Sequence, residues 1–266
     1  MCKGLPQIAL IFAEKEPVCS GLRILRETLL LPEMKKEHLK EIDFAEGAVL
    51  LIDKPLEWTS FDVVRKVRNL IRVKKVGHAG TLDPLATGLL VVCTGKFTKQ
   101  INTYMAREKE YTGTFTIGAV TPTYDLESSP ENFKPYEHIT LFEIEAATHQ
   151  FTGTIQQIPP AHSAIKKDGK RVYELARKGI EVQLDPRTVV ISSFEIDATR
   201  LPEIAFKVVC STGTYIRSLA HDFGQALGCG AYLSSLRRTR IGSFSVNEAI
   251  TMDAFTEAMK ERKADL

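Results

Sequence analysis

Short apolar runs and apolar–polar alternations, each bounded by turn residues, predict most of the strands of this chain. The predicted strands are residues 48–52, 89–93, 109–118, 151–155, 189–196 and 204–210. Apolar residues at helical spacing predict helices at residues 96–106, 141–147 and 215–227, and a short polar helix near the C-terminus. Because strand and helix signals are interleaved along the chain, we expect an α/β (α+β) fold.

A further helix is predicted after residue 58, where Thr59 or Ser60 can cap the first turn. Its apolar face is expected to hold the residues at helical spacing, which are Phe61, Val64, Val67 and Ile71. Residues 63–82 contain six basic residues and no acid. Most such runs are only the solvated face of a helix. Since this one leads into the loop at residues 77–90, we interpret it as a surface that contacts phosphates.

Three other segments are interpreted from their charge and turn residues. Residues 233–240 form a further basic cluster. Residues 121–145 are acidic and contain proline, so we expect a surface excursion that contacts nucleic acid poorly. Residues 166–171 contain a Lys-Asp-Gly turn, which predicts a hairpin with Lys166, Lys167, Lys170 and Arg171 around its tip. A basic tip is often only a soluble turn, but beside the basic helix it could clamp a nucleic-acid stem.

Composition narrows the class of protein only modestly. The chain has 266 residues, of which 44% are hydrophobic, and a formal net charge of +2 at pH 7. This length suits one domain of about 200–250 residues or two small ones. Nucleic-acid binding is compatible with a small net charge, because positive charge can gather on one face. No apolar run approaches the roughly 20 residues that span a bilayer, so we expect a soluble protein without membrane association.

The cysteines and histidines give no sign of a metal site. Five cysteines and six histidines are dispersed, with neither CxxC nor HExxH spacing. An odd number of scattered cysteines indicates reduced thiols and hence a cytoplasmic protein. We therefore expect a mechanism that needs no metal.

Residues 1–33 differ from the rest of the chain because they show no clear period. The apolar patch at residues 5–12 could pass for a poor signal peptide, but Lys3 is its only early positive charge, and acidic residues stand where a cleavage site would be. We hypothesise that the natural chain starts at Met34, which opens a polar leader into a well-patterned domain.

The stretch GHAGTLDPLATGLL, at residues 77–90, is the part of the chain whose residues restrict the backbone conformation most. It contains three glycines and one proline, and Asp83 is its only acid. Pro84 restricts Asp83 to an extended conformation, and the glycines allow backbone angles and close approaches that side chains forbid. Taken alone, Leu-Asp-Pro-Leu is an ordinary turn. The stretch is neither a GxxxxGK[ST] loop nor a GxGxxG fingerprint, so nucleotide-cofactor binding gains no support.

As a whole, this stretch closely resembles the motif around the catalytic aspartate of the TruB family of tRNA pseudouridine synthases. Other parts of the chain are similar to further motifs of that family, in the same order and at similar spacing. These parts are Asp53-Lys54-Pro55 with Thr59-Ser60, Lys109-Glu110-Tyr111, the block PPAHSAIKKDGKRVYELARKG, Gly213-Thr214-Tyr215-Ile216-Arg217 and Leu236-Arg237-Arg238. The resemblance implies a pseudouridine synthase fold, with a mixed, mostly antiparallel sheet, flanking helices and a central basic cleft that contains Asp83.

The resemblance also divides the chain into three parts. Residues 46–252 are expected to form the catalytic domain, preceded by an N-terminal extension at residues 1–45 and followed by a helical tail at residues 253–266. Many bacterial relatives continue into a small PUA-like RNA-binding domain. Its absence here predicts weaker tRNA binding with the chemistry preserved.

The implied reaction is isomerisation of uridine to pseudouridine at position 55 in the TΨC loop of tRNA. The base is detached at N1, turned and rejoined through C5, after it has been flipped out of its loop. No cofactor is needed, because the reaction is redox-neutral and the base is retained. The expected partner is the tRNA stem-loop, bound by a monomer that requires no protein partner. The alternatives are another target uridine, a guide-RNA-dependent role and a noncatalytic tRNA-folding module.

Three residues are assigned to the chemistry by the resemblance. Asp83 is the essential carboxylate, acting either as a nucleophile toward the sugar or as the base that removes a sugar proton. Desolvation would raise its pKa, so a cationic partner is needed to keep it ionised. Arg217 matches the arginine that pairs with this aspartate, and Tyr111 matches the tyrosine that stacks on the flipped base. Without the resemblance, Arg217 would be interpreted as a helix-surface arginine and Tyr111 as a core or cross-strand tyrosine.

Four further residues are assigned to substrate binding. Tyr215 and Leu236 match pocket residues around the target nucleotide, although Leu236 alone would be interpreted as core. His78 matches the histidine that inserts near the vacated base position, and Lys54 supports the loop or a phosphate. One departure from the family is Glu57, which stands where the family commonly has glycine. It leaves the local backbone geometry and the charge near the RNA open.

Overall fold

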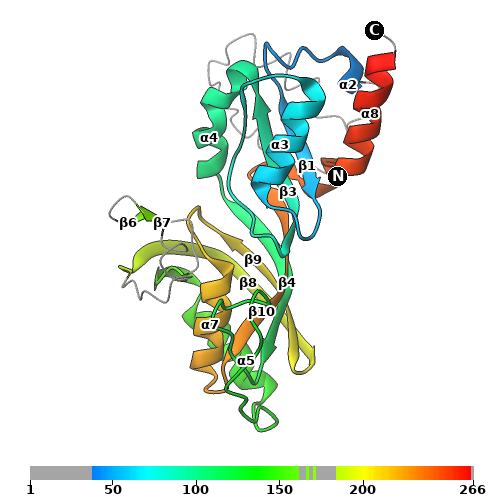
Figure 1. The fold of residues 1–266 in the computed structure, drawn as a ribbon. Coiled ribbons are helices and arrows are strands. Elements are labelled where there is room, and N and C mark those ends of the chain that lie inside the picture. The colour runs from blue at the N-terminus through cyan, green and yellow to red at the C-terminus, as the bar shows by residue number, and fades with distance from the viewer. Residues whose placement is uncertain (1–37, 162–165, 168–169, 172–183, 265–266) are drawn as a thin grey trace, which may run out of the picture. The chain divides into compact units, whose positions relative to one another are not determined.

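The computed structural model describes residues 38–161, 166–167, 170–171 and 184–264 (Figure 1). All of them belong to one of the two units into which the chain divides, Glu33–Leu266. The hypothesis about Met34 and most of the predicted N-terminal extension lie outside the described residues. Among the helices that the structure describes, none has the length and apolarity needed to cross a membrane.

A ten-stranded mixed sheet forms the centre of this unit. Across the sheet, the strands are β12 (Ile250–Thr251), β1 (Val49–Lys54), β3 (Ala86–Thr94), β10 (Ala231–Ile241), β4 (Lys109–Ile117), β9 (Glu203–Cys210), β8 (Arg187–Arg200) and β5 (Gly153–Gln157). Strand β2 (Val76–His78) pairs with β3, and β11 (Phe244–Ser245) pairs with β10. Only the pairs β1–β12 and β3–β10 are parallel among these strands, so the predicted mixed, mostly antiparallel sheet is confirmed.

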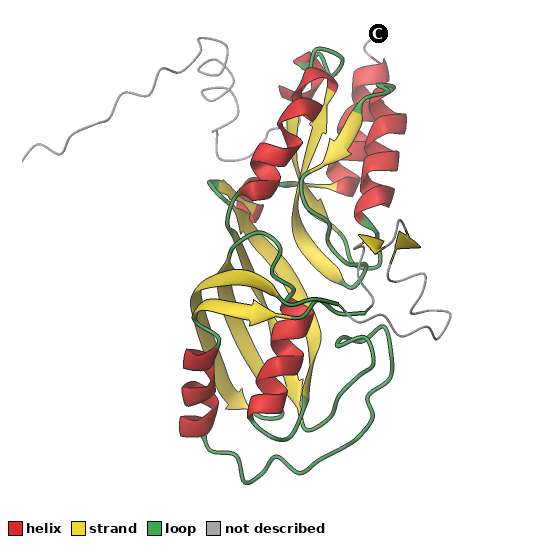
Figure 2. Cartoon of the chain, turned by 90° about the vertical axis from the view of Figure 1, so that its left-hand side faces the viewer, coloured by secondary structure: helices red, strands yellow, loops and turns green. Residues whose placement is uncertain are grey.

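Helices flank both ends of the sheet (Figures 1 and 2). At the β1–β3 end lie α2 (His38–Glu41), α3 (Ser60–Ile71) and α8 (Met252–Ala264), while α5 (Leu141–Gln150) and α7 (Ile216–Ala226) cover strands β8 and β10 at the other end. The predicted helix at residues 96–106 is a 3₁₀ turn, η1 (Gly95–Gln100), followed by α4 (Ile101–Ala106). A short η2 (Val246–Glu248) precedes β12.

Two large apolar clusters hold these layers together. One surrounds Phe115, Phe206 and Phe223 between the sheet and helices α5 and α7. The other joins α3, α8 and strands β1 and β3, and it also contains Leu39 and Phe44. The packed core therefore includes side chains that precede residue 46 and side chains of α8 that follow residue 252.

Helix α3 begins where the sequence predicts it, and Val64 and Val67 of the expected apolar face are buried. Thr59 forms a capping box with Asp62, in which each side chain accepts from the other residue's backbone N–H. The buried positions include Ser60, Val63 and Val67, whereas Phe61 is 60% exposed. The prediction that Phe61 faces the core is wrong, because Ser60 occupies that stripe one position earlier and bonds to the neighbouring loop.

Strand β10 was not predicted from the sequence, where its residues were interpreted as a basic cluster. Its buried positions include the charged Arg238, so the usual alternation of apolar and polar residues is hidden. The predicted hairpin is present as the pair β6 (Lys166–Lys167) and β7 (Lys170–Arg171). The turn between them and the side chains at the tip lie outside the described residues.

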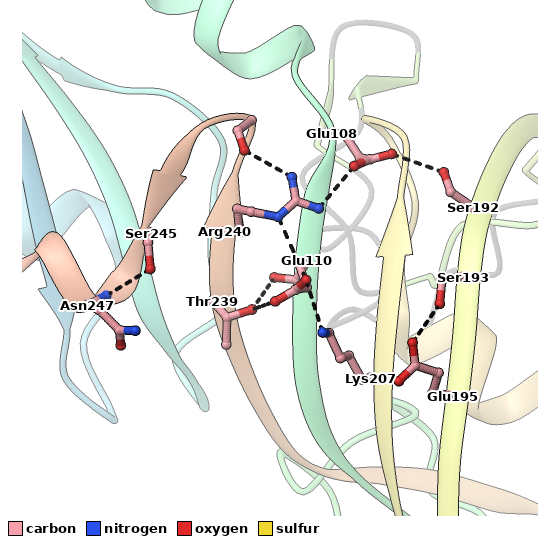
Figure 3. A network of polar contacts seen from close by, with 11 residues as sticks. Glu108, Glu110, Ser192, Ser193, Glu195, Lys207, Thr239, Arg240, Ser245 and Asn247 are labelled. Carbon is pink, nitrogen blue, oxygen red and sulfur yellow. Dashed lines mark hydrogen bonds and ion pairs between the residues drawn. The ribbon is translucent and has the colours of Figure 1, made fainter. Parts of the chain in front are cut away.

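A polar network crosses four strands near their β10–β4 junction (Figure 3). Arg240 Nη2 lies 3.0 Å from Glu108 Oε1, and Arg240 Nε lies 3.7 Å from Glu110 Oε2. Glu110 also pairs with Lys207 at 3.5 Å, and Ser192 donates to Glu108. Successive side chains of a strand point to opposite faces, so the network lies on the face of β4 opposite to that of Lys109 and Tyr111.

Candidate active site

A cavity of about 300 Å³ opens between the loop before β3, the start of β4 and the start of α7. Its lining includes residues 80–83, 211–217 and the strand positions Tyr111, Leu236 and Arg238. Of the residues predicted to form the site, five line this cavity: Asp83, Tyr111, Tyr215, Arg217 and Leu236. Cavities of this size accept small ligands.

The loop that carries Asp83 is attached to helix α3 and strand β1. Leu82 N–H donates to Ser60 Oγ at 2.8 Å, and the Ser60 hydroxyl donates to Leu82 O at 3.2 Å. Glu57 N–H donates to Pro84 O at 2.9 Å. Residues on both sides of Asp83 are thus bonded, which limits the positions that its carboxylate can take.

Gly88 allows the end of this loop to lie against β10. Its φ is +100°, and a Cβ at this position would lie 2.3 Å from Arg238 O. Any other residue would therefore clash with the backbone of β10. The glycine at position 88 is required by this close approach of two strands.

Lys54 lies under the loop and is fully buried. Its ammonium donates to three carbonyl oxygens: Trp58 O at 2.6 Å, Pro55 O at 2.9 Å and Pro84 O at 3.3 Å. Burial lowers the pKa of Lys54 to about 8, and the charge of Asp83 opposes that shift. All three hydrogen bonds of the Lys54 ammonium go to backbone carbonyls. Of the two roles predicted for Lys54, the geometry therefore favours support of the loop over contact with a phosphate.

Glu57 adopts a left-handed backbone conformation, with φ of 66°. This conformation is unfavourable for a residue with a Cβ and is adopted readily by glycine. A glycine at position 57 would therefore meet this backbone requirement at lower cost than the glutamate in this chain.

Asp83 and Arg217 are in contact, although 133 residues separate them. Arg217 Nε lies 3.0 Å from Asp83 Oδ2, and Arg217 Nη2 donates to Asp83 Oδ1 at 3.4 Å. The side chain of Arg217 is 5% exposed, whereas that of Asp83 is 38% exposed. The guanidinium therefore forms the buried base of the site, and the carboxylate faces the cavity.

A second carboxylate contacts the same guanidinium. Asp125 Oδ2 lies 3.6 Å from Arg217 Nε, and Arg217 Nη1 donates to Thr123 O at 3.4 Å. The side chain of Asp125 is 6% exposed. Sequence reasoning missed this residue, because it assigned residues 121–145 to a surface excursion.

That assignment is wrong for the beginning of the segment, where Thr121, Thr123 and Asp125 are all buried. The excursion reaches the site because Leu233 N–H of β10 donates to Tyr124 O at 2.9 Å. The sequence signal for this burial is polar residues at every second position, ending in Asp125. Without the tertiary contact, this signal is weak.

The pKa of Asp83 is raised above its ordinary value. Burial in the cavity is the main cause, because protein surrounds the carboxylate on most sides even though its outer face is exposed. Arg217 opposes this shift, Asp125 adds to it by charge repulsion, and Lys54 opposes it more weakly. Arg217 therefore favours the ionised form of Asp83.

Tyr111 is almost fully buried and stands opposite Arg238 in the pairing of β4 with β10. Arg238 is 1% exposed, and it donates to Leu89 O at 2.8 Å and to Gly80 O at 3.1 Å. Burial raises the pKa of Tyr111, and the Arg238 guanidinium opposes that rise. Arg238 thus connects the tyrosine to the loop of Asp83, a role that the sequence motif alone did not reveal.

Lys109 is a second buried cation of the cavity that was not assigned a role from the sequence. It lies two residues before Tyr111 and lines the same wall. Its ammonium donates to Met105 O. Burial and the charge of Arg238 lower its pKa to about 8. The cavity wall therefore carries positive charge that suits a polyanionic substrate.

Tyr215 and His78 are placed differently with respect to the cavity. The backbone of Tyr215 exchanges two hydrogen bonds with the Gln157 side chain, and the Arg187 guanidinium lies 5.6 Å from its ring centre. His78 ends β2 opposite Val92, outside the cavity lining. Burial and Arg238 lower the pKa of His78, so its imidazole is neutral at pH 7.

In the described part of the chain, no group of three or more His, Cys, Asp or Glu side chains could hold a metal ion.

Solved structures with a similar fold identify the class of protein. The structure described as "Crystal Structure of a Cbf5-Nop10-Gar1 Complex" matches with a TM-score of 0.63 and 28% identity, over 84% of this chain and 63% of that chain. The "Structure of H/ACA RNP bound to a substrate RNA containing 2'-deoxyuridine" matches with a TM-score of 0.63 and 28% identity, over 88% and 59% of the two chains. The fold is that of the pseudouridine synthases.

Sequence comparisons identify the family. The family described as TruB family pseudouridylate synthase (N terminal domain) matches residues 68–216, and the tRNA pseudouridylate synthase B C-terminal domain matches residues 217–265. The tRNA pseudouridine synthase B of Flavobacterium johnsoniae is 53% identical over 225 residues, which cover 82% of this chain and 98% of that protein. That of Phocaeicola vulgatus is 49% identical over 230 residues, or 84% and 98% of the two chains. This chain belongs to the TruB family of tRNA pseudouridine synthases, and it is an isomerase.

Proposed function

We propose that the protein converts uridine to pseudouridine at position 55 in the TΨC loop of tRNA. The observation that carries this proposal is the contact of Asp83 with the buried Arg217 at the base of a cavity that a single nucleoside can enter. The relatives named tRNA pseudouridine synthase B support tRNA as the substrate. The resemblance of residues 77–90 to the TruB motif supports the target position.

The target nucleotide must leave its stacked loop before it can reach Asp83. Unstacking and unpairing cost about a few kcal/mol, which contacts to the flipped base and to the backbone must supply. Tyr111 and Leu236 offer faces for the base, and Lys109 adds positive charge to the wall. Basic residues on α3 provide a further surface for phosphates.

Asp83 carries out the first step in this proposal. Its carboxylate either attacks the sugar as a nucleophile or removes a sugar proton, and in both cases the bond between C1′ and N1 breaks. The uracil then turns within the cavity, and a bond forms between C1′ and C5. As this bond forms, the bond between Asp83 and C1′ breaks on the nucleophilic route, and on the other route the abstracted proton returns to the sugar. The proton on C5 leaves to a base or to water and N1 gains a proton, so that atoms and charges balance.

Arg217 has two functions in this scheme. Its guanidinium holds both oxygens of Asp83 in position, and it opposes the rise in the pKa of that carboxyl. Tyr111 lies on the cavity wall, where its ring can stack on the detached base and its hydroxyl is near Arg238.

Tritium release from tRNA labelled at C5 of uracil tests the proposal. We expect release by the wild type, and none above background by Asp83→Ala or by the isosteric Asp83→Asn. Binding of tRNA by Asp83→Asn should remain, measured by filter retention at the same ionic strength. Equal release by the wild type and Asp83→Asn would remove Asp83 from the chemistry.

A noncatalytic tRNA-folding module is the alternative from another class. Such a protein would use the same basic surfaces and would have no need for a carboxylate–guanidinium pair inside a cavity. Absence of release by wild-type protein, with tRNA binding intact, would favour that alternative. Release from a tRNA whose uridine 55 is replaced by cytidine would instead indicate another target uridine.

A further inference from the structure

The loop residue Tyr124 stacks on His221 of helix α7, next to the site. Their ring centres are 4.0 Å apart, and the ring planes differ by 16°. Both residues adjoin the network of the site: Tyr124 precedes Asp125, and His221 lies one helical turn after Arg217. Residues four apart on a helix lie on the same face. The stack therefore joins the segment that carries Asp125 to the face of α7 that carries Arg217.

Tyr124 adopts an unfavourable backbone conformation to make this contact. Its φ is 64°, in the left-handed region that residues with a Cβ seldom occupy. Such conformations persist only where surrounding contacts enforce them. The backbone here is held on both sides, because Tyr124 N–H donates to Thr121 O at 3.1 Å and Tyr124 O accepts from Leu233 N–H at 2.9 Å.

The electrostatic surroundings of the stack are compatible with packed aromatic rings. Burial lowers the pKa of His221, so its imidazole is neutral at pH 7, and its Nδ1 is buried without a hydrogen-bond partner in the described part of the chain. The charge of Asp222 on α7 contributes to the raised pKa of Tyr124, and burial raises the pKa of Asp222 itself to about 6. The position of His221 is thus defined by ring packing.

We propose that the Tyr124–His221 stack is a positioning device that holds the carboxylate of Asp125 against Arg217 and thereby fixes the guanidinium that contacts Asp83. Neither ring lines the cavity, so the stack acts through Asp125. Leu233 anchors the backbone of Tyr124, and His221 anchors its side chain from outside the loop. This inference rests on the proposed function for its kinetic readout.

The kinetic test compares His221→Ala with Asp125→Asn and with the double variant. We expect His221→Ala to lower kcat about tenfold with little change in KM, because a small displacement of a positioning group is costly in an organised site. In the Asp125→Asn background, His221→Ala should cause no further loss. His221→Phe, which keeps a stacking ring, should restore most of the activity.

The pH profile provides a readout that a purely structural role would not change. Asp125 repels the charge of Asp83 and so raises its pKa. Displacing Asp125 should therefore lower the pKa of Asp83 and move the acidic limb of kcat to lower pH in His221→Ala and in Asp125→Asn alike. The control is Phe244→Ala, which removes a tilted contact with Tyr104 at 5.7 Å in another cluster and should leave this limb in place.

Multiplicative losses in the double variant, or an unmoved acidic limb in His221→Ala, would overturn the proposal. A readout without RNA separates it from the proposed function. The Arg217 Nε–H resonance should be sharp in the wild type and broadened or shifted in His221→Ala, while His221→Phe should resemble the wild type. If wild-type protein released no tritium but this resonance behaved as expected, the positioning device would stand and the assigned reaction would fall.

Discussion

At the scale of single residues, the site depends on one guanidinium that two carboxylates share. Arg217 contacts Asp83 at 3.0 Å and Asp125 at 3.6 Å, and all but 5% of its side-chain surface is buried. A buried charge is tolerated only when it is paired and hydrogen-bonded. Arg217 therefore stabilises both carboxylates, and its removal leaves two negative charges without their shared counter-charge.

Arg217→Met should destabilise the protein by about 3–5 kcal/mol at pH 7, because it leaves the buried carboxylate of Asp125 and the partly exposed one of Asp83 without their counter-charge. The pKa of Asp83 is already raised, and without Arg217 it rises further. Between the unfolded and folded pKa values, the folded state binds more protons, so stability increases as the pH falls. Urea denaturation at pH 7 and pH 5 should thus show a smaller deficit at pH 5. A larger deficit at pH 5 would contradict this expectation.

Glu57 provides a second residue-scale prediction. Glu57→Gly should raise the free energy of unfolding by up to about 1 kcal/mol, because relief of the left-handed conformation outweighs the added flexibility of the unfolded chain. Glu57→Ala is the matched control, since it removes the charge and keeps the Cβ. If thermal denaturation showed the same gain for both variants, the cause would be charge and not backbone conformation.

At the scale of elements, helix α3 has two adjacent hydroxyl residues with different tasks. Thr59 caps the helix, and Ser60 bonds to the backbone of Leu82 in the loop of Asp83. The helix thereby places the loop as well as the basic residues on its exposed side. Strand β10 also has two roles. It pairs with β3 and β4 in the middle of the sheet, and its residues Leu236 and Arg238 line the cavity.

Thr59→Ala and Ser60→Ala should therefore separate helix stability from loop placement. Loss of the Thr59 cap should cost about 1 kcal/mol of stability and leave kcat nearly unchanged. Ser60→Ala should cost about 1–3 kcal/mol, because the buried Leu82 N–H loses its acceptor, and it should also lower kcat. Denaturation and single-turnover kinetics of both variants provide the measurement. Equal kcat values in the two variants would show that Ser60 does not position the loop.

At the scale of the whole molecule, positive charge is found around the cavity and on the exposed side of helix α3. Arg65 is largely exposed on α3, and the cavity contains Lys109 and Arg238 with the pair of Arg217 and Asp83. The net charge of +2 conceals this distribution. Electrostatic attraction to phosphates depends on the local arrangement of charge and on salt.

Arg65→Gln and Lys66→Gln should each weaken tRNA binding and reduce the slope of log K against log salt by about 1, if each residue contacts one phosphate. Fluorescence anisotropy of labelled tRNA from low to high salt provides the measurement. Lys134→Gln is the control, because Lys134 is exposed in the acidic segment at residues 121–145. A change of slope in the control as large as in the α3 variants would show that the binding surface lies elsewhere.

Much of the fold follows from local patterns that the sequence displays directly. Apolar periodicity predicted strands β1, β3, β4, β8 and β9 and helix α7, after which Gly228 adopts a left-handed conformation. The resemblance of residues 77–90 and of further segments to the motifs of one family predicted Asp83 and its partners. These signals are local, because propensity and turn geometry act over a few residues.

Only the tertiary structure decided which charged residues are buried and what they contact. Arg238 and Asp125 were assigned to a basic cluster and a surface segment, since charged residues are exposed by default. Both are buried because long-range contacts compensate them: Leu89 O and Gly80 O accept from Arg238, and Arg217 pairs with Asp125. By itself, the sequence determined the elements and the family, whereas the compensation of buried charge across distant segments decided the geometry of the site.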